Sequence, residues 1–116
     1  MTEMFDLAEK SCTPCRGGTP PLSGNKLSAL AEQLSPKWSV ESGHHLICTF
    51  TFSNFKQALA FTNAIGEVAE HEQHHPEITL TWGLVVVRIW THKIDGLTEN
   101  DFILAAKISA IQKTIS

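Results

Sequence analysis

A long amphipathic stretch in the middle of the chain limits the possible folds most. Between residues 54 and 74, apolar side chains recur every three or four positions, which is the period of one face of an α-helix. The Ser-Asn pair at 53–54 can cap the start of this helix. Pro76 disfavours helical geometry in the residue before it, so the helix has to end near His74. The apolar stripe consists of Phe55, Ala58, Phe61, Thr62, Ile65, Val68 and Ala69.

Two stretches on either side of this helix alternate in the way that half-buried β-strands do. One face of residues 45–52 carries Leu46, Cys48, Phe50 and Phe52, and one face of residues 84–92 carries Val85, Val87, Ile89 and Thr91. Shorter strands are predicted at about 38–41 and 77–81. The first short strand precedes a Ser-Gly-His turn, so it should form a hairpin with residues 45–52.

Two further helices complete the predicted set of elements. The first covers roughly residues 25–35, with Ser23 as its cap and Pro36 after its end. The last opens at residues 98–101, a variant of the capping box, and its apolar stripe is Leu104, Ile108, Ile111 and Ile115. The order α-β-β-α-β-β-α predicts an α+β fold: a four-stranded antiparallel sheet with three helices packed on one face.

The length of 116 residues favours one domain. We assign residues 25–116 to this domain and residues 1–24 to a flexible leader, whose proline and glycine residues disfavour regular structure. The leader contains a single C-x-x-C at Cys12 and Cys15. We interpret this motif as two free thiols on a mobile tail, with transient metal capture or a redox pair as the alternatives, and give it no catalytic role.

Charge and composition exclude several classes of function. The formal net charge is −3 without a basic run, so we expect no binding to nucleic acid. No apolar run reaches the roughly 20 residues of a membrane span, so we expect no membrane partner. The first ten residues lack the pattern of a secretory signal. Three cysteines are too few for a disulfide scaffold, and a reducing cytoplasm is the simplest setting.

Residues 70–101 contain His71, His74, His75 and His92 among the chain's six histidines. Histidine can give and take protons near neutral pH, and a reaction that removes water needs both an acid and a base. Glu70 lies four residues before His74, so we expect its carboxylate to orient that ring. Taken singly, each of these residues is more often a solvated or packing residue than a catalytic one.

A metal site is the main alternative for these histidines. The string from His71 to His75 reads H-E-x-x-H, with imidazoles four residues apart and a glutamate between them. This segment ends at Pro76, and no third ligand follows at a standard spacing. We therefore predict no metal ligands here.

The spacing of the whole segment resembles the signature of the pterin-4a-carbinolamine dehydratases. The defined positions are Glu70, His74-His75-Pro76, Trp82, His92 and Asp101, with three, five, nine and eight residues between them. The resemblance covers about residues 23–116. It implies dehydration of 4a-hydroxytetrahydropterin to quinonoid dihydropterin, without a metal or organic cofactor. Such enzymes recycle the pterin of aromatic amino acid hydroxylases, chiefly phenylalanine hydroxylase.

The resemblance also implies the site residues. His74, His75 and His92 would be the catalytic histidines: His74 and His92 would act as acid and base, in an order left open, and His75 would hold the pterin. The substrate-binding residues would be Glu70, Thr91 and Asp101.

Two other properties concern partners. The family commonly forms dimers or tetramers, and Arg88 and Trp90 on an open sheet face agree with a homo-oligomer. Animal members of the family also act as dimerisation cofactors of a homeodomain transcription factor. A non-catalytic binding module, or a dehydratase-like protein acting on another pterin, therefore remains an alternative function.

Overall fold

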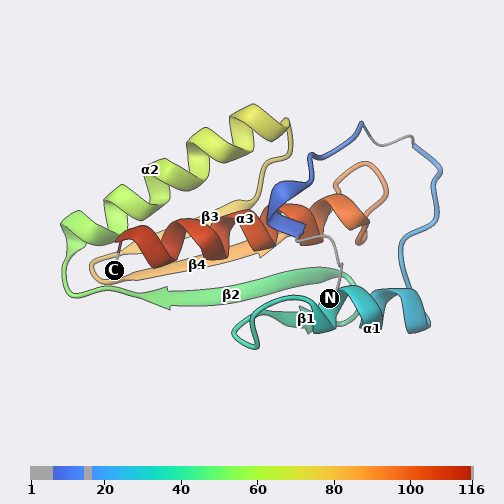
Figure 1. The fold of residues 1–116 in the computed structure, drawn as a ribbon, viewed down its shortest axis with the longest axis horizontal. Coiled ribbons are helices and arrows are strands. Elements are labelled where there is room, and N and C mark those ends of the chain that lie inside the picture. Colours follow the sequence, from blue (N-terminus) through green and yellow to red (C-terminus); the bar gives the residue numbers. More distant parts are fainter. Residues whose placement is uncertain (1–6, 15–16, 116) are drawn as a thin grey trace.

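The computed structural model describes residues 7–14 and 17–115 and confirms the predicted order of elements. One turn of 3-10 helix, η1, precedes that order at Leu7–Glu9. The helices are α1 (Gly24–Glu32), α2 (Phe55–Glu72) and α3 (Glu99–Ile115). The strands are β1 (Ser39–Glu41), β2 (His45–Thr51), β3 (Glu77–Thr81) and β4 (Leu84–Ile89) (Figure 1).

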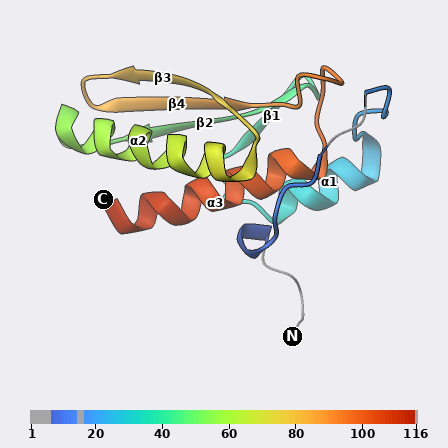
Figure 2. The same ribbon diagram turned by 90° about the horizontal axis from the view of Figure 1, so that it is seen from above.

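The four strands form one antiparallel sheet in the order β1-β2-β4-β3. Seen from above, α1, α2 and α3 all lie on the same side of this sheet (Figure 2). The two long strands are its centre, and their core-facing pairs are Leu46 with Ile89, Cys48 with Val87 and Phe50 with Val85. The predicted α+β fold is therefore confirmed.

The core lies between the sheet and the helices. Phe61 on α2 is fully buried and packs on Phe50 and Phe52, with ring centroids 4.7 and 5.1 Å apart. Burying a large apolar side chain contributes about 1.5–3 kcal/mol. The other fully buried large side chains include Ile65, Leu97, Phe102, Leu104 and Ile108. This packing holds α2 and α3 against the same face of the sheet (Figure 2).

The chain after β4 differs from the prediction. The strand ends at Ile89 instead of His92, and Thr91 instead forms an isolated bridge with Gly96. The turn between them contains Asp95 with a positive φ of 52°. A Cβ atom on Gly96 would lie 2.6 Å from the Cβ of Pro21, so this close approach requires glycine. The sheet therefore stops early, and the chain folds back towards the start of α3.

The described part of the leader packs on the domain. Leu7 is 4% exposed, and the ammonium group of Lys107 donates to the carbonyl of Ala8 at 2.7 Å. Figure 2 shows η1, in dark blue, next to α3, and the residues after it crossing that helix. An apolar anchor and long-range hydrogen bonds therefore hold these residues against the domain. Cys15 lies outside the described residues, and the flexibility of the leader stays a prediction.

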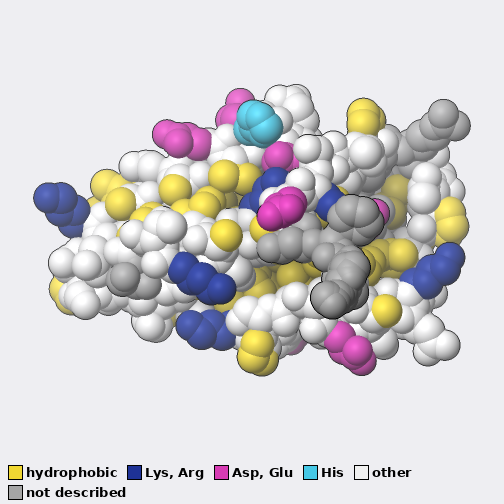
Figure 3. Space-filling model, viewed as in Figure 1, with side chains coloured by type: hydrophobic (Ala, Val, Ile, Leu, Met, Phe, Trp, Pro, Cys, Tyr) yellow, Lys and Arg dark blue, Asp and Glu magenta, His cyan; other side chains and the backbone are white. Residues whose placement is uncertain are grey.

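Acidic and basic side chains are scattered over the face shown in Figure 3, with no single-sign patch. Among the described helices, none is long and apolar enough to cross a membrane.

Candidate functional site

His74 leaves α2 through a left-handed turn. The helix ends at Glu72, and Gln73 has a φ of 58°, after which the N–H of His74 bonds the carbonyl of Ala69 at 3.1 Å. The ring then points away from its own helix, and its Nε2 lies 2.5 Å from Oδ1 of Asp101 on α3. The side chains of the pair are 13% and 0% exposed. A buried carboxylate thus holds the imidazole of His74 in one orientation.

Asp101 is held on its other oxygen. Oδ2 accepts a hydrogen bond from the hydroxyl of Thr91 at 2.9 Å and from the N–H of Thr98 at 2.7 Å. The second bond is the predicted helix cap, and the hydroxyls of Thr91 and Thr98 are 2.9 Å apart. A buried charge is tolerated when hydrogen bonds satisfy it. The carboxylate therefore has two functions, since it caps α3 and positions His74.

The expected pairing of Glu70 with His74 is wrong. The Glu70 carboxylate instead lies 2.5 Å from Nε2 of His75. The i,i+4 geometry does not reach His74, because α2 already ends at Glu72. Both side chains of the Glu70–His75 pair are mostly exposed, at 75% and 57%. An exposed pair of this kind contributes about 0–1 kcal/mol to stability.

His92 lies beyond β4 and is exposed. Its ring stacks on Trp90, with centroids 4.5 Å apart. Trp90 also contacts His44 and His45, at 5.4 and 5.9 Å between ring centroids, which extends the aromatic cluster onto the open face of the sheet. His44 in turn lies 2.7 Å from Asp95. No sequence pattern links His44 or His45 to Trp90.

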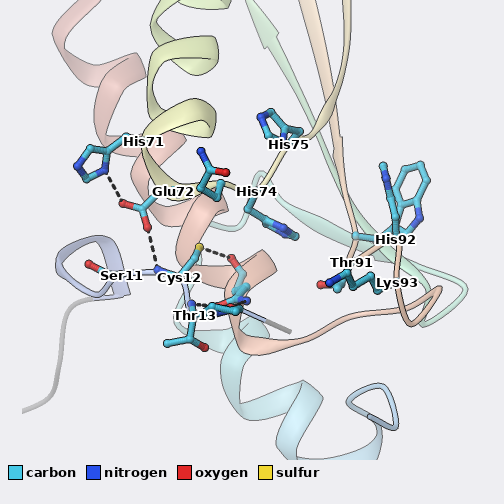
Figure 4. A pocket seen from close by; sticks show the side chains of 14 residues that line it. Ser11, Cys12, Thr13, His71, Glu72, His74, His75, Thr91, His92 and Lys93 are labelled. Carbon is cyan, nitrogen blue, oxygen red and sulfur yellow. Dashed lines mark hydrogen bonds and ion pairs between the residues drawn. The ribbon is translucent and has the colours of Figure 1, made fainter. Parts of the chain in front are cut away.

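These elements surround a pocket with a volume of about 620 Å³. Figure 4 shows Cys12 and Thr13 on one side, Thr91, His92 and Lys93 on the other, and His74 between them. Four of the six predicted site residues line this pocket, namely His74, His75, Thr91 and His92. Asp101 does not line it but lies behind His74, and Glu70 reaches it only through His75. The remaining lining residues are Ser11, Cys12, Thr13, Pro14, His71, Glu72, Gln73, Trp90, Lys93 and Asn100.

Glu72 connects the leader to this pocket. Its side chain is 4% exposed, and Oε1 accepts the N–H of Cys12 at 2.8 Å. Burial alone would raise the pKa of Glu72. The bond from Cys12 and the contacts with His71 and Lys107 outweigh this effect, so the pKa lies below its usual value. The carboxylate is therefore a stable anion in the pocket wall, and its contact with the leader was not predicted from the sequence.

Cys12 faces the same region. Its Sγ lies 3.6 Å from the carbonyl of Asn100. Burial, followed by the neighbouring Glu72 carboxylate, raises the pKa of the thiol to about 12. The thiol is thus protonated at neutral pH and is a poor nucleophile.

The alternative metal site is not assembled in the part of the chain that the structure describes. His71 is 83% exposed and lies 3.2 Å from Glu72, whereas His75 pairs with Glu70. Among the described side chains, no group of three or more His, Cys, Asp or Glu residues is arranged to hold a metal ion.

The fold and the pocket define a class: a small α+β protein in which histidines from a helix end and a strand end surround a site suited to acid–base chemistry. The family model named pterin 4 alpha carbinolamine dehydratase matches residues 20–111. The chain therefore belongs to the pterin-4a-carbinolamine dehydratase family.

Relatives and solved structures agree with this assignment. The chain is 53% identical over 108 residues to a protein of Rubrobacter xylanophilus, and 51% identical over 109 residues to one of Alkaliphilus metalliredigens. Both are provisionally named pterin-4-alpha-carbinolamine dehydratase. The alignments cover 93% and 94% of this chain and 100% and 98% of the relatives.

Two solved structures share the fold. One is a transcriptional coactivator/pterin dehydratase from Brucella melitensis, with a TM-score of 0.74 and 29% identity over 79% of this chain and 98% of that one. The other is a pterin dehydratase-like protein described as a RuBisCO assembly factor in the α-carboxysome. It has a TM-score of 0.58 and 23% identity over 66% of this chain and 89% of that one, and shows the fold alone.

Proposed function

We propose that this protein is a dehydratase that converts 4a-hydroxytetrahydropterin to quinonoid dihydropterin and water. The observation that carries the proposal is one pocket in which His74, held by the buried Asp101, lies between the leader and His92. Its volume of about 620 Å³ is in the usual range of about 300–1,000 Å³ for sites that bind small molecules. Family membership supplies the substrate class.

The reaction requires two proton transfers. The bond between C4a and the hydroxyl oxygen breaks, the hydroxyl takes a proton and leaves as water, and N5 loses its proton as the C4a=N5 double bond forms. A general acid and a general base therefore have to reach the two adjacent atoms. We assign these two roles to His74 and His92, and we assign binding of the pterin to His75.

The contacts of His74 support its role. Because Nε2 faces Asp101, Nδ1 is the ring nitrogen that can exchange a proton with substrate while the pair stays closed. Asp101 would stabilise the ring when it carries the additional proton, as a carboxylate next to an imidazole does in other acid–base sites. Thr91, two residues beyond the end of β4, fixes Asp101, and Glu70 would orient His75 for the pterin.

The setting of the activity is part of the proposal. The pterin product would feed the recycling that supports an aromatic amino acid hydroxylase such as phenylalanine hydroxylase, in the cytoplasm and without a metal or organic cofactor. A homodimer or homotetramer is supported by the open face of the sheet, where Trp90 and Arg88 are only partly buried.

A double replacement tests the assignment. His74→Ala with His92→Ala should abolish the accelerated decay of 4a-hydroxytetrahydropterin, generated by a phenylalanine hydroxylase and followed by ultraviolet absorbance. Circular dichroism should be unchanged, because neither ring belongs to the apolar core. Turnover that persists in the double variant would show that these two residues are not the acid and base.

A second candidate function is a protein-binding module. The structure from Brucella melitensis is described as both a transcriptional coactivator and a pterin dehydratase, so the fold is compatible with either. A module that only binds a protein partner would keep its affinity in the same double variant. A dehydratase-like protein acting on another pterin would instead lose turnover of that pterin.

A further inference from the structure

Residues 11–14 of the leader, which we call the strap, form one wall of the histidine pocket. All four line it, and Figure 4 shows Cys12 and Thr13 across from His92. The family model begins to match only at residue 20, whereas the alignments with the two relatives cover 93% and 94% of the chain and so include the strap. None of the four residues is among the acid, base or pterin-holding residues proposed above, which are His74, His92 and His75.

A buried amide on α3 holds the strap. Oδ1 of Asn100 accepts the N–H of Thr13 at 2.9 Å, and Nδ2 of Asn100 donates to the carbonyl of Thr13 at 2.6 Å. Asn100 is only 6% exposed. Both backbone groups of one strap residue are therefore bound by one side chain, in the way that a neighbouring β-strand would bind them.

A buried carboxylate on α2 holds Cys12, the residue before Thr13. Glu72 accepts the N–H of Cys12 at 2.8 Å, and its other oxygen lies 3.7 Å from the ammonium group of Lys107. Lys107 also donates to the carbonyl of Ala8. Burying polar or charged groups is costly unless hydrogen bonds satisfy them. Departure of the strap would leave these buried groups without the backbone partners that they have here.

The residues that hold the strap are next to those that hold His74. Asn100 directly precedes Asp101, and Glu72 lies two residues before His74. The docked strap and the oriented imidazole therefore depend on the same two helix ends. A flat polar ring placed against His74 and His92 would meet the strap on its remaining side.

We propose that the strap is a wall of the substrate-binding site, and that Asn100 and Glu72 are positioning residues that hold it against the bound pterin. The inference rests on the proposed function. A docked strap narrows the pocket and excludes water from one side of the ring, so it contributes to binding of the pterin more than to the proton transfers. Releasing it should raise KM more than it lowers kcat.

Two variants release the strap from opposite sides. Asn100→Asp keeps the size of the side chain but replaces the amide group that donates to the Thr13 carbonyl with an oxygen. Thr13→Pro removes the backbone N–H that donates to Oδ1 of Asn100. The second change lies in the leader and leaves the domain intact. Glu99→Gln is the control, because Glu99 pairs with Lys10 of the leader in an exposed position and does not line the pocket.

Two readouts are measured on each variant. The first is KM and kcat for 4a-hydroxytetrahydropterin. The second is the rate at which iodoacetamide alkylates Cys12, located by mass spectrometry, which needs no turnover. Both releasing variants should alkylate at least about tenfold faster than wild type, because the freed thiol loses the burial that suppresses its thiolate. They should also raise KM about tenfold, and Glu99→Gln should change neither quantity.

The outcomes separate this inference from the proposed function. Faster alkylation with unchanged KM would overturn the strap as a substrate wall and leave the dehydratase intact. Unchanged alkylation in both variants would overturn the role of Asn100. If wild type shows no turnover, the proposed function fails, and protection of Cys12 by 7,8-dihydrobiopterin becomes the test. Protection in wild type that is lost on Asn100→Asp supports the strap as a binding wall, and absence of protection overturns it.

Discussion

Replacing Asp101 by asparagine tests the contact on which the site depends. Asp101 is fully buried, and its partners are Nε2 of His74 at 2.5 Å, the hydroxyl of Thr91 at 2.9 Å and the N–H of Thr98 at 2.7 Å. Asparagine has nearly the same shape, and its Oδ1 can keep both bonds on the threonine side. Its amide then faces His74 as a neutral donor, so the charge-assisted bond to the imidazole is lost.

The structure sets the size of the effect. A hydrogen bond to a charged group contributes about 1.5–3 kcal/mol, and about 1.36 kcal/mol corresponds to a factor of ten in rate. If that bond stabilises the protonated ring in the transition state, kcat should fall about 10- to 150-fold. The free energy of unfolding should fall by no more than about 2 kcal/mol, because the cap on α3 is retained. Asp101→Ala would cost about 3–5 kcal/mol, since it breaks a buried pair and removes the cap.

The assay combines turnover of 4a-hydroxytetrahydropterin with thermal unfolding. Asp95→Asn is the matched control. Asp95 also pairs with a histidine, His44, but the Asp95 side chain is 85% exposed. The control should retain wild-type kcat and stability. Wild-type kcat in Asp101→Asn across pH 6–9 would refute the role of Asp101 in the chemistry, and loss of folding in that variant would refute the retained cap.

Three further predictions concern stability and substrate binding. Gly96→Ala should lower the free energy of unfolding, measured by chemical denaturation, by about 1–3 kcal/mol, because its Cβ would collide with Pro21. Gly66→Ala on α2 is the matched control: its Cβ meets no atom within 4 Å, so it should raise the free energy of unfolding by about 0.5–1 kcal/mol. Equal effects of the two changes would contradict the close approach at Gly96. Burial raises the pKa of Cys12 from 9.0 to about 12 and that of Cys48 from 9.0 to about 11. The two protonated thiols therefore contribute fully to the folded state's stability below pH 9, and this contribution is lost as the pH rises through the two raised pKa values. Chemical denaturation of the double serine variant should therefore show a weaker alkaline loss than wild type, and an identical loss would refute this origin. Glu70→Gln should change the free energy of unfolding by less than about 1 kcal/mol, because the pair of Glu70 with His75 is exposed. Any effect on turnover should appear in KM. A large drop in kcat at constant KM would assign Glu70 to the chemistry instead.

Local patterns in the sequence were sufficient for the fold. The alternation of residues 45–52 and 84–92 identified the core-facing side chains of the two central strands, and the 3.6-residue period identified the buried face of α2. The capping box at Thr98 likewise located the start of α3. Each of these signals depends on residues that are close together in the chain.

The remaining features of the site depend on contacts between distant residues. Glu70 was paired with the wrong histidine, because one left-handed residue, Gln73, ends the helix before i,i+4 geometry reaches His74. The strap was missed because prolines and glycines in the leader indicate only the absence of regular structure. Its hydrogen bonds to Glu72 and Asn100 span 60 and 87 residues of sequence. Neither residue can be distinguished by sequence from a solvated helix residue.

The decay of 4a-hydroxytetrahydropterin in the presence and absence of this protein tests the central claim most directly. The account predicts accelerated decay that persists when a chelator is present. Acceleration that the chelator removes would contradict the metal-free mechanism and direct attention to His71 and His75 as ligands. No acceleration under either condition would contradict the dehydratase and favour a protein-binding function for the same fold.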